Sequence, residues 1–227
     1  MATFVLVPGA GGGTWFWQRL IPELVSRGHD AIPVDLPTGD ESAGLTEYAD
    51  AIVAAGAGRG PVVLVAQSMG AYSASMVCDR LPVEQLVLVN PMVPAPGETP
   101  GEYWANTGQG PAAAEYAASE GRPAEFDVVR TFFHDVPNDI TEYAMSQGEP
   151  PQADKPFGQP WPLTEWPAVP IRFLQGQDDR LFPLAFQQRV AKQRLPGVVV
   201  DEVPGGHLNS LSQPTAIADR MVDYLTP

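Results

Sequence analysis

Cysteine is almost absent from this chain of 227 residues, which contains a single one, Cys78. One cysteine cannot form a disulfide within the chain, so the sequence favours a reducing compartment, and we expect a cytoplasmic protein. Cys78 lies among apolar residues, where a thiol is more often packed and inert than reactive. Histidine is scarce as well, with three in all, and none stands at metal-ligand spacing from another ligand. We therefore expect no metal and no other cofactor.

Basic residues are also few. Lys and Arg total 13 against 27 Asp and Glu, which gives a formal net charge of −14, and they form no basic block. This balance argues against nucleic acid or an anionic membrane as a partner. No apolar run is long enough to cross a membrane, and the N-terminus passes directly into apolar residues without the basic region of a secretory signal.

Proline and glycine, in contrast, are plentiful, with 25 prolines and 22 glycines, and the prolines gather between residues 91 and 167. On either side of this stretch, short buried strands alternate with amphipathic helices, a pattern typical of a parallel sheet with helices on both faces. We expect an α/β core formed by residues 1–90 and 168–227. The stretch 91–167 is expected to be an inserted helical cap over the sheet.

The expected elements follow from periodicity and turn residues. Strands are predicted over residues 3–7, 30–34, 62–65, 85–89, 171–174 and 198–203. Core helices are predicted over 15–27, 45–55, from about 69 to 80, 184–193 and 213–225. Inside the insertion, the prolines up to Pro100 should prevent regular structure, and short helices are expected near 111–119, 123–132 and 138–146.

The most informative segment is the apolar run 62–65, which leads to Ser68 between small residues. A continuous β-branched run predicts a buried parallel strand, and the small residues that follow allow a sharp turn into a helix. This is the nucleophile-elbow pattern G-x-S-x-G, with Ala66 in the first glycine position. The sequence therefore predicts Ser68 as a nucleophile at the tip of a strained turn.

A serine hydroxyl needs a general base to become a nucleophile, and the base needs an orienting acid. His207 follows the last expected strand on a glycine-rich loop, where open α/β sheets carry their chemistry, and we predict it as the base. His29 precedes a strand at the other end of the sheet. His134 falls inside the insertion and is expected to be structural or surface-exposed.

The acid should lie on the loop after the preceding strand, where Asp178 and Asp179 are both available. In many proteins of this design the acid stands three residues after a glycine and four before a proline, and both counts select Asp179. Asp178 remains the alternative, with capping of the turn as its other role. The order Ser68, Asp179, His207 is the one expected for acyl transfer on this architecture.

The negatively charged oxygen of a tetrahedral intermediate needs preorganised hydrogen-bond donors. The backbone N–H of Met69, directly after the serine, is one candidate. The N–H of Ala10, in the glycine-rich turn after the first strand, is the other. That turn could otherwise be a plain flexible loop. A phosphate-binding loop does not fit, because no lysine follows at the required spacing.

With these motifs, the chain resembles the α/β-hydrolase superfamily over essentially its full length. More narrowly, it resembles the small esterase and hydroxynitrile-lyase branch, which includes plant methyl esterases and bacterial esterase-like proteins. The resemblance is carried by residues 4–10, 15–17, 67–70, 176–183 and 206–207. It implies a sheet of about six strands with a helical cap. It also implies Ser68, Asp179 and His207 as the triad and the N–H groups of Ala10 and Met69 as the oxyanion hole.

The chain departs from the family pattern in its oxyanion turn. Pro8 stands where the family usually has a histidine, which removes a scaffold hydrogen bond without removing a backbone donor, and two glycines replace a bulkier pair at 11 and 12. Gly9 and Leu208 occupy the positions at which the hydroxynitrile lyases carry a threonine and a lysine. Cyanide chemistry is therefore not expected.

The resulting expectation is a hydrolase of small, largely apolar carboxylic esters or related acyl compounds that works through an acyl-enzyme. The aromatic residues Trp15, Trp17, Trp104 and Trp161 are candidates for the substrate pocket, although aromatics at helical spacing often serve only in packing. The alternative is a non-hydrolytic use of the fold, as a small-molecule receptor or as a cofactor-independent lyase or oxygenase. The oligomeric state is open, and a homodimer is one option.

Overall fold

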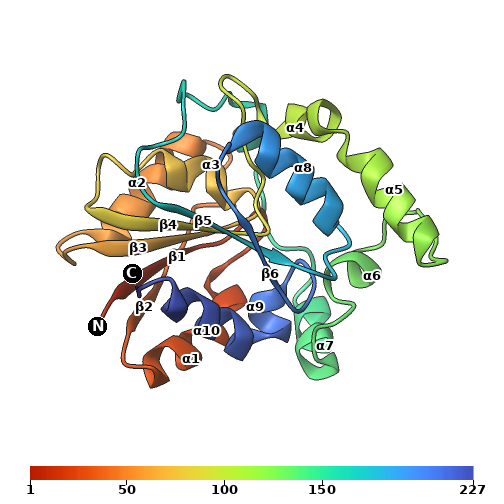
Figure 1. Ribbon diagram of the computed structural model, residues 1–227, viewed down its shortest axis with the longest axis horizontal. Helices are drawn as coiled ribbons and strands as arrows, with labels where there is room; N and C mark the ends of the chain where they lie inside the picture. The colour runs from red at the N-terminus through yellow and green to blue at the C-terminus, as the bar shows by residue number, and fades with distance from the viewer. Residues whose placement is uncertain (227) are drawn as a thin grey trace.

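The strands within residues 1–226 pair in parallel in one six-stranded sheet with the order β2-β1-β3-β4-β5-β6 (Figure 1). The computed structural model describes residues 1–226. The strands are β1 (Thr3–Val7), β2 (Asp30–Pro33), β3 (Val62–Gln67), β4 (Val83–Val89), β5 (Ile171–Gly176) and β6 (Val200–Val203). The expected α/β fold with a parallel sheet of six strands is confirmed.

Helices cover both faces of the sheet. In Figure 1 one face carries α2 (Leu45–Gly56), α3 (Gly70–Ser75) and α8 (Leu184–Arg194), and the other carries α1 (Leu20–Ser26), α9 (Asn209–Ser212) and α10 (Pro214–Asp223). Successive residues of a strand point to opposite faces. Val5 and Val7 of β1 therefore join one apolar core with α2, while Phe4 and Leu6 join a second core with α1. Two buried faces explain why the strands read as continuous apolar runs.

The segment between β4 and β5 carries α4 (Pro100–Thr107), α5 (Gln109–Ser119), α6 (Val128–Phe132), α7 (Asn138–Ser146) and the 3₁₀ turn η2 (Lys155–Gly158). Figure 1 shows α6 and α7 beside the carboxyl ends of the strands. Pro100 does not prevent a helix, as the sequence had suggested, but begins α4. A proline is tolerated in the first turn, where its missing N–H has no helical partner. Thr99 and Glu102 form a capping box there, with hydrogen bonds of 3.1 and 3.0 Å.

Three expected helices are shorter or divided, for local reasons. The segment expected as one helix over 15–27 consists of the 3₁₀ turn η1 (Thr14–Trp17) and α1, because a helix running through Pro22 would clash with the carbonyl four residues earlier. Pro214 separates α9 from α10 in the same way. The helix expected over 123–132 is restricted to α6, and the elbow helix α3 ends at Ser75 rather than near residue 80.

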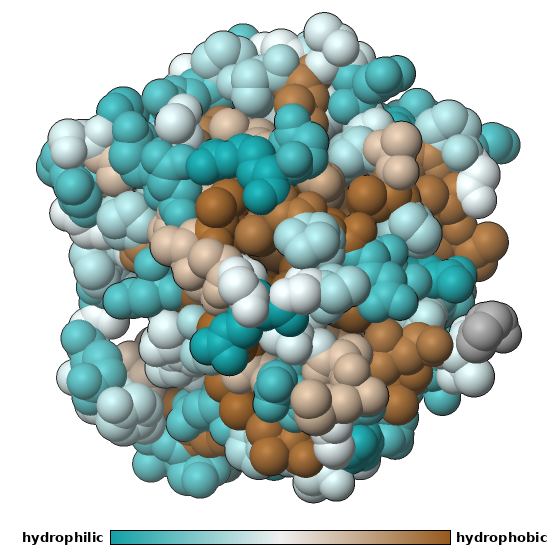
Figure 2. Space-filling model, turned by 90° about the vertical axis from the view of Figure 1, so that its left-hand side faces the viewer, coloured by the Kyte–Doolittle hydropathy of each residue, from teal (hydrophilic) through white to brown (hydrophobic). Residues whose placement is uncertain are grey.

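Figure 2 shows the face at the amino ends of the strands, where apolar patches are interrupted by hydrophilic side chains, an ordinary mixture for a folded domain. Over residues 1–226 no helix combines the length and the apolar character needed to cross a membrane. Burial raises the pKa of the Cys78 thiol to about 12, so this group stays protonated at neutral pH.

Candidate active site

Ser68 lies in the sharp turn between β3 and α3, with φ at 51°. This left-handed conformation is costly for a residue with a side chain, so the surrounding structure must hold it. The Ser68 N–H donates to the carbonyl of Val89 at 3.1 Å, and the Ser68 carbonyl accepts from the N–H of Met92 at 3.0 Å. Both partners belong to β4 or the residues after it. The neighbouring strand thus fixes the strained turn.

Two glycines allow the turn after β1 to pack directly against this elbow. A Cβ atom on Gly9 would lie 2.8 Å from Cβ of Ser68, and one on Gly70 would lie 2.5 Å from the carbonyl oxygen of Pro8. No side chain fits in either place, which explains the glycine two residues after the serine. The close approach brings the turn that contains Ala10 beside Ser68 and Met69.

The two N–H groups expected to form an oxyanion hole are free of internal partners. Within residues 1–226, neither the Ala10 N–H nor the Met69 N–H donates a hydrogen bond to another group of the protein. The N–H of Gly9, by contrast, donates to Oε1 of Gln67 at 3.0 Å. Two free backbone donors beside a serine are the arrangement that binds a developing oxyanion.

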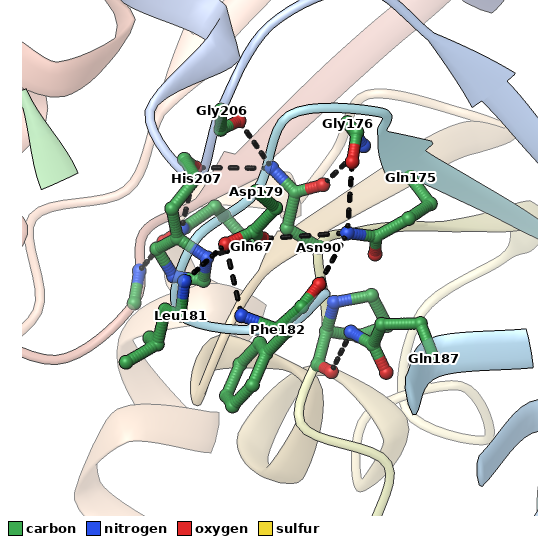
Figure 3. Close-up of polar contacts among 12 residues, drawn as sticks. Gln67, Asn90, Gln175, Gly176, Asp179, Leu181, Phe182, Gln187, Gly206 and His207 are labelled. Carbon is green, nitrogen blue, oxygen red and sulfur yellow. Dashed lines mark hydrogen bonds and ion pairs between the residues drawn. The ribbon is translucent and has the colours of Figure 1, made fainter. Parts of the chain in front are cut away.

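His207 and Asp179 form a buried pair on the loops after β6 and β5 (Figure 3). The Nδ1 atom of His207 lies 2.8 Å from Oδ2 of Asp179, with 2% and 0% of the two residues exposed. The other carboxylate oxygen accepts hydrogen bonds of 2.9 Å from the N–H groups of Leu181 and Phe182. These donors stabilise the carboxylate, which within residues 1–226 makes no ion pair with a lysine or arginine. With Nδ1 bonded to the acid, Nε2 is left to act as a base.

Asp178 points elsewhere. Its N–H donates to the carbonyl of Gly205 at 3.1 Å, and its Oδ2 accepts from the Gly205 N–H at 3.4 Å. This carboxylate therefore ties the loop after β5 to the loop after β6, a turn-holding role. Of the two adjacent aspartates, the one that contacts the histidine ring is Asp179.

Asn90 holds the two loops together and was not among the residues selected from the sequence. Its side-chain N–H₂ donates to the carbonyls of Gly206 and His207 at 3.2 and 3.0 Å, and its Oδ1 accepts from the N–H of Gly176 at 2.7 Å (Figure 3). The residue is fully buried, with φ at 45°. Asparagine tolerates this conformation better than most residues, which suits it to the sharp turn directly after β4.

Two buried glutamines complete the same network. Gln67 accepts from the Gly9 N–H and donates to the carbonyl of His207 at 3.4 Å. It therefore links the turn after β1, residues 8–13, to the loop that carries His207. Gln175 donates to Oδ2 of Asp179 at 3.3 Å. A sequence signal for these residues exists: each is a carboxamide that follows buried apolar residues at the carboxyl end of a strand. Parallel strands bring such ends to one edge of the sheet.

The insertion also reaches the histidine loop. Oδ2 of Asp135 accepts a hydrogen bond of 2.7 Å from the N–H of Gly206, and a Cβ atom on Gly206 would lie 2.5 Å from Nε2 of His134. His134 is thus a largely buried neighbour of the loop, and the expected structural role fits its position. His29 lies at the amino end of the sheet, where its Nδ1 accepts from the N–H of Ala2.

Aromatic rings surround His207 on the side of the insertion. The rings of Phe182 and Phe132 meet the imidazole edge to face at 5.2 and 5.4 Å between centroids. Phe132 also lines a cavity of about 490 Å³ between the insertion and the loop after β5. The other principal lining residues are Trp104, Phe126, Leu181, Arg122 and Arg180.

Of the four tryptophans expected at the pocket, Trp104 lines this cavity. Trp17 and Trp161 instead lie fully buried in the two apolar cores, where packing explains them. The indole N–H of Trp161 donates to Oγ of Ser75 at 2.9 Å. Trp15 is half-buried near the oxyanion turn. Sequence alone could not separate core indoles from cavity indoles, because both follow similar apolar patterns.

The chain as a whole matches a known family. A model described as the alpha/beta hydrolase family matches residues 4–220. Because this match spans nearly the entire chain, the protein belongs to the α/β-hydrolase family. The narrower likeness to esterases rests on individual relatives.

One similar protein is the probable esterase PIR7A of Oryza sativa subsp. indica, 34% identical over 108 residues. That match covers 42% of this chain and 41% of the rice protein, so it spans less than half of the relative's length. The pyrethroid hydrolase of Sphingobium wenxiniae is 25% identical over 97% of this chain and 86% of its own. Among solved structures, polyneuridine aldehyde esterase superposes with a TM-score of 0.76 at 21% identity, covering 99% of both chains. At that identity the superposition supports the fold alone.

Proposed function

We propose that this protein is a carboxylic ester hydrolase that acts through a triad of Ser68, His207 and Asp179 and an acyl-enzyme. The observation that carries the proposal is the buried hydrogen bond of 2.8 Å between His207 and Asp179, on loops tied to the elbow that holds Ser68. The likeness to proteins named esterase and pyrethroid hydrolase supports ester bonds as the substrate class.

In the acylation step, Oγ of Ser68 attacks the ester carbonyl carbon while Nε2 of His207 takes the serine proton. The N–H groups of Ala10 and Met69 bind the resulting oxyanion, and Asp179 stabilises the imidazolium. The tetrahedral intermediate then expels the alcohol, which receives the proton from His207. In deacylation, His207 takes a proton from water while the water oxygen attacks the acyl carbon. The second tetrahedral intermediate then breaks its bond to Ser68, whose Oγ receives the proton from His207, and the carboxylic acid is released.

The proposed substrate is a small, largely apolar ester. The cavity of about 490 Å³ is lined by Phe132, whose ring contacts the imidazole of His207, and is of a size that takes a small organic molecule. Its aromatic wall, with Trp104, Phe126 and Phe132, supports an apolar acyl or alcohol group at this position. Arg122 and Arg180 at the same cavity would tolerate polar substituents on that group.

The test is covalent labelling by a fluorophosphonate, followed by location of the adduct by mass spectrometry and assay of a panel of p-nitrophenyl esters. We expect stoichiometric labelling at Ser68 and ester turnover, both lost in folded Ser68→Ala. Folded wild-type protein that neither reacts nor turns over any ester would contradict the proposal and favour a receptor. Labelling of Ser68 with no ester turnover would instead point to a lyase or oxygenase that uses the same serine.

A further inference from the structure

The oxyanion turn, residues 8–13, is held by a residue that lies far away in the sequence. Oε1 of Gln152, in the segment between β4 and β5, accepts a hydrogen bond of 2.9 Å from the N–H of Gly11, across a separation of 141 residues. Gly11 has φ at 63° and is followed by two further glycines, and within the turn one backbone hydrogen bond forms, from the Gly12 N–H to the Gly9 carbonyl at 3.0 Å. Pro8, at its start, has no N–H and no polar side chain with which to hold it.

Gln152 is itself fixed in place. Its Nε2 donates to the hydroxyl of Tyr48 at 3.2 Å and to the carbonyl of Ala153 at 3.0 Å. Tyr48 is a buried residue of α2, and the N–H of Ala153 donates to the carbonyl of Thr38 at 2.7 Å. Both supports belong to the core. The side chain of Gln152 therefore holds the turn in a fixed position relative to the core.

The hydrogen bonds of the turn leave the Ala10 N–H without a partner within residues 1–226, while the carbonyl of the same peptide unit, that of Gly9, accepts from the Gly12 N–H at 3.0 Å. The N–H of Gly9 is bound by Gln67, and the N–H of Gly11 is bound by Gln152. These two N–H groups belong to the peptide units on either side of the Gly9–Ala10 peptide. With both neighbouring units fixed, the orientation of the Ala10 N–H is fixed too.

From this geometry we propose that Gln152 is a positioning residue for the oxyanion hole, which holds the Ala10 N–H toward the carbonyl oxygen at Ser68 through Gly11. The inference rests on the proposed ester hydrolysis. Gln152 does not touch the substrate in this role. Its contribution is preorganisation: a donor that must be ordered during the reaction stabilises the oxyanion less than one held in place beforehand.

The test compares Gln152→Met, which keeps the length of the side chain and removes its polar atoms, with Gln152→Glu, which keeps an acceptor for the Gly11 N–H. The exposed neighbour Asp154, whose side chain makes no hydrogen bond within residues 1–226, supplies the control Asp154→Ala. The readouts are kcat, KM, the thermal midpoint and the Kd of a trifluoromethyl ketone, which forms a tetrahedral adduct with the serine.

Removing one oxyanion donor outright typically costs on the order of 10²–10³ in kcat. Because Gln152→Met only loosens a donor, we expect kcat to fall roughly 10- to 50-fold and the affinity for the ketone to fall by the same factor. KM should remain close to wild type, since substrate binding is not altered. The thermal midpoint should fall by only a few degrees, because the Tyr48 hydroxyl and the Gly11 N–H each lose one partner. Gln152→Glu should lose less than Gln152→Met, and Asp154→Ala should behave as wild type.

A kcat and a ketone affinity within twofold of wild type in folded Gln152→Met would overturn the inference. So would a change confined to KM, which indicates contact with substrate rather than a role at the oxyanion. If Gln152→Met does not fold, Gln152→Ala is judged by the same readouts. Failure of the underlying function is distinguishable, because wild-type protein would then show neither labelling of Ser68 nor ester turnover.

Discussion

The carboxylate of Asp135 accepts a hydrogen bond of 2.7 Å from the backbone N–H of Gly206, the residue directly before His207. Asp135 belongs to the insertion and Gly206 to the loop after the last strand. The contact therefore joins the insertion to the loop that carries the proposed general base. The covering segment and the sheet edge are parts of one polar network.

Replacing Asp135 with Ala should weaken both stability and turnover. A buried backbone N–H left without its charged acceptor costs about 1–3 kcal/mol of unfolding free energy. A loosened His207 should lower kcat roughly tenfold, because small displacements of a catalytic group are costly. Asp135→Asn retains an oxygen acceptor and should lose much less. Urea unfolding and ester turnover of the pair measure this, and equal losses in the two variants would contradict the role assigned to the hydrogen bond.

Substitution of Asn90 should weaken the protein for two separable reasons, the loss of its side-chain hydrogen bonds and the strain of its left-handed backbone conformation. Asn90→Ala and Asn90→Gly both remove the hydrogen bonds to Gly176, Gly206 and His207, and both should lower ester turnover strongly. Glycine adopts the left-handed conformation without strain, whereas alanine does not. The Gly variant should therefore be the more stable of the two by about 1 kcal/mol. Denaturant midpoints of the two proteins decide the point, and a more stable Ala variant would show that the backbone angle is not a constraint.

His134 should make the protein less stable at mildly acid pH. Burial lowers the pKa of this imidazole, and repulsion from Arg180 acts in the same direction, against the attraction of Asp135. The unfolded chain, with a pKa near 6.5, then binds a proton more readily than the folded protein. Stability is thus expected to fall as pH drops below about 6.5, down to the lower folded-state pKa. Urea unfolding of wild type and His134→Gln at pH 7.5 and 5.0 tests this, and an unchanged slope in the variant would exclude His134 as the cause.

Breaking the buried ion pair of Glu98 and Arg194 should cost far more unfolding free energy than breaking an exposed pair. The two groups meet at 2.5 and 2.8 Å in a bidentate contact that joins the start of the insertion to α8. Burial opposes the charge of Glu98, but hydrogen bonds from Arg194 and Asn106 outweigh it and lower the pKa of this carboxyl. Glu98→Gln leaves the guanidinium unpaired and should cost about 3–5 kcal/mol of unfolding free energy.

The exposed pair of Arg80 and Asp50, at 2.7 Å, provides a matched control. Asp50→Asn should change the unfolding free energy by less than about 1 kcal/mol, because solvent screens this contact. Comparable losses in Glu98→Gln and Asp50→Asn would show that burial does not govern the value of these pairs. Differential scanning calorimetry of the two variants is sufficient.

The features that the sequence determined by itself are local ones, namely the strands, the turn at Ser68 and the choice between two adjacent aspartates. The apolar run ending at Ser68 predicts both a buried strand and the turn after it, because backbone conformation follows from a few adjacent residues. The strands were expected within a few residues of their observed ends, and the acid was selected between two adjacent aspartates by its distance from a glycine and a proline. In each case the signal lies within about ten residues of the feature.

What only the tertiary structure decided are the contacts between distant segments. The pairing of Gln152 with Gly11, of Asp135 with Gly206, and of Asn90 with the loop before His207 joins residues 141, 71 and 116 positions apart. A single carboxamide or carboxylate forms no sequence pattern from which its distant hydrogen-bond partner could be predicted. Its hydrogen bond exists because the sheet brings the strand ends to one edge and the insertion packs against them. The sequence therefore specifies which groups could perform the chemistry, and the packing of loops specifies how they are held.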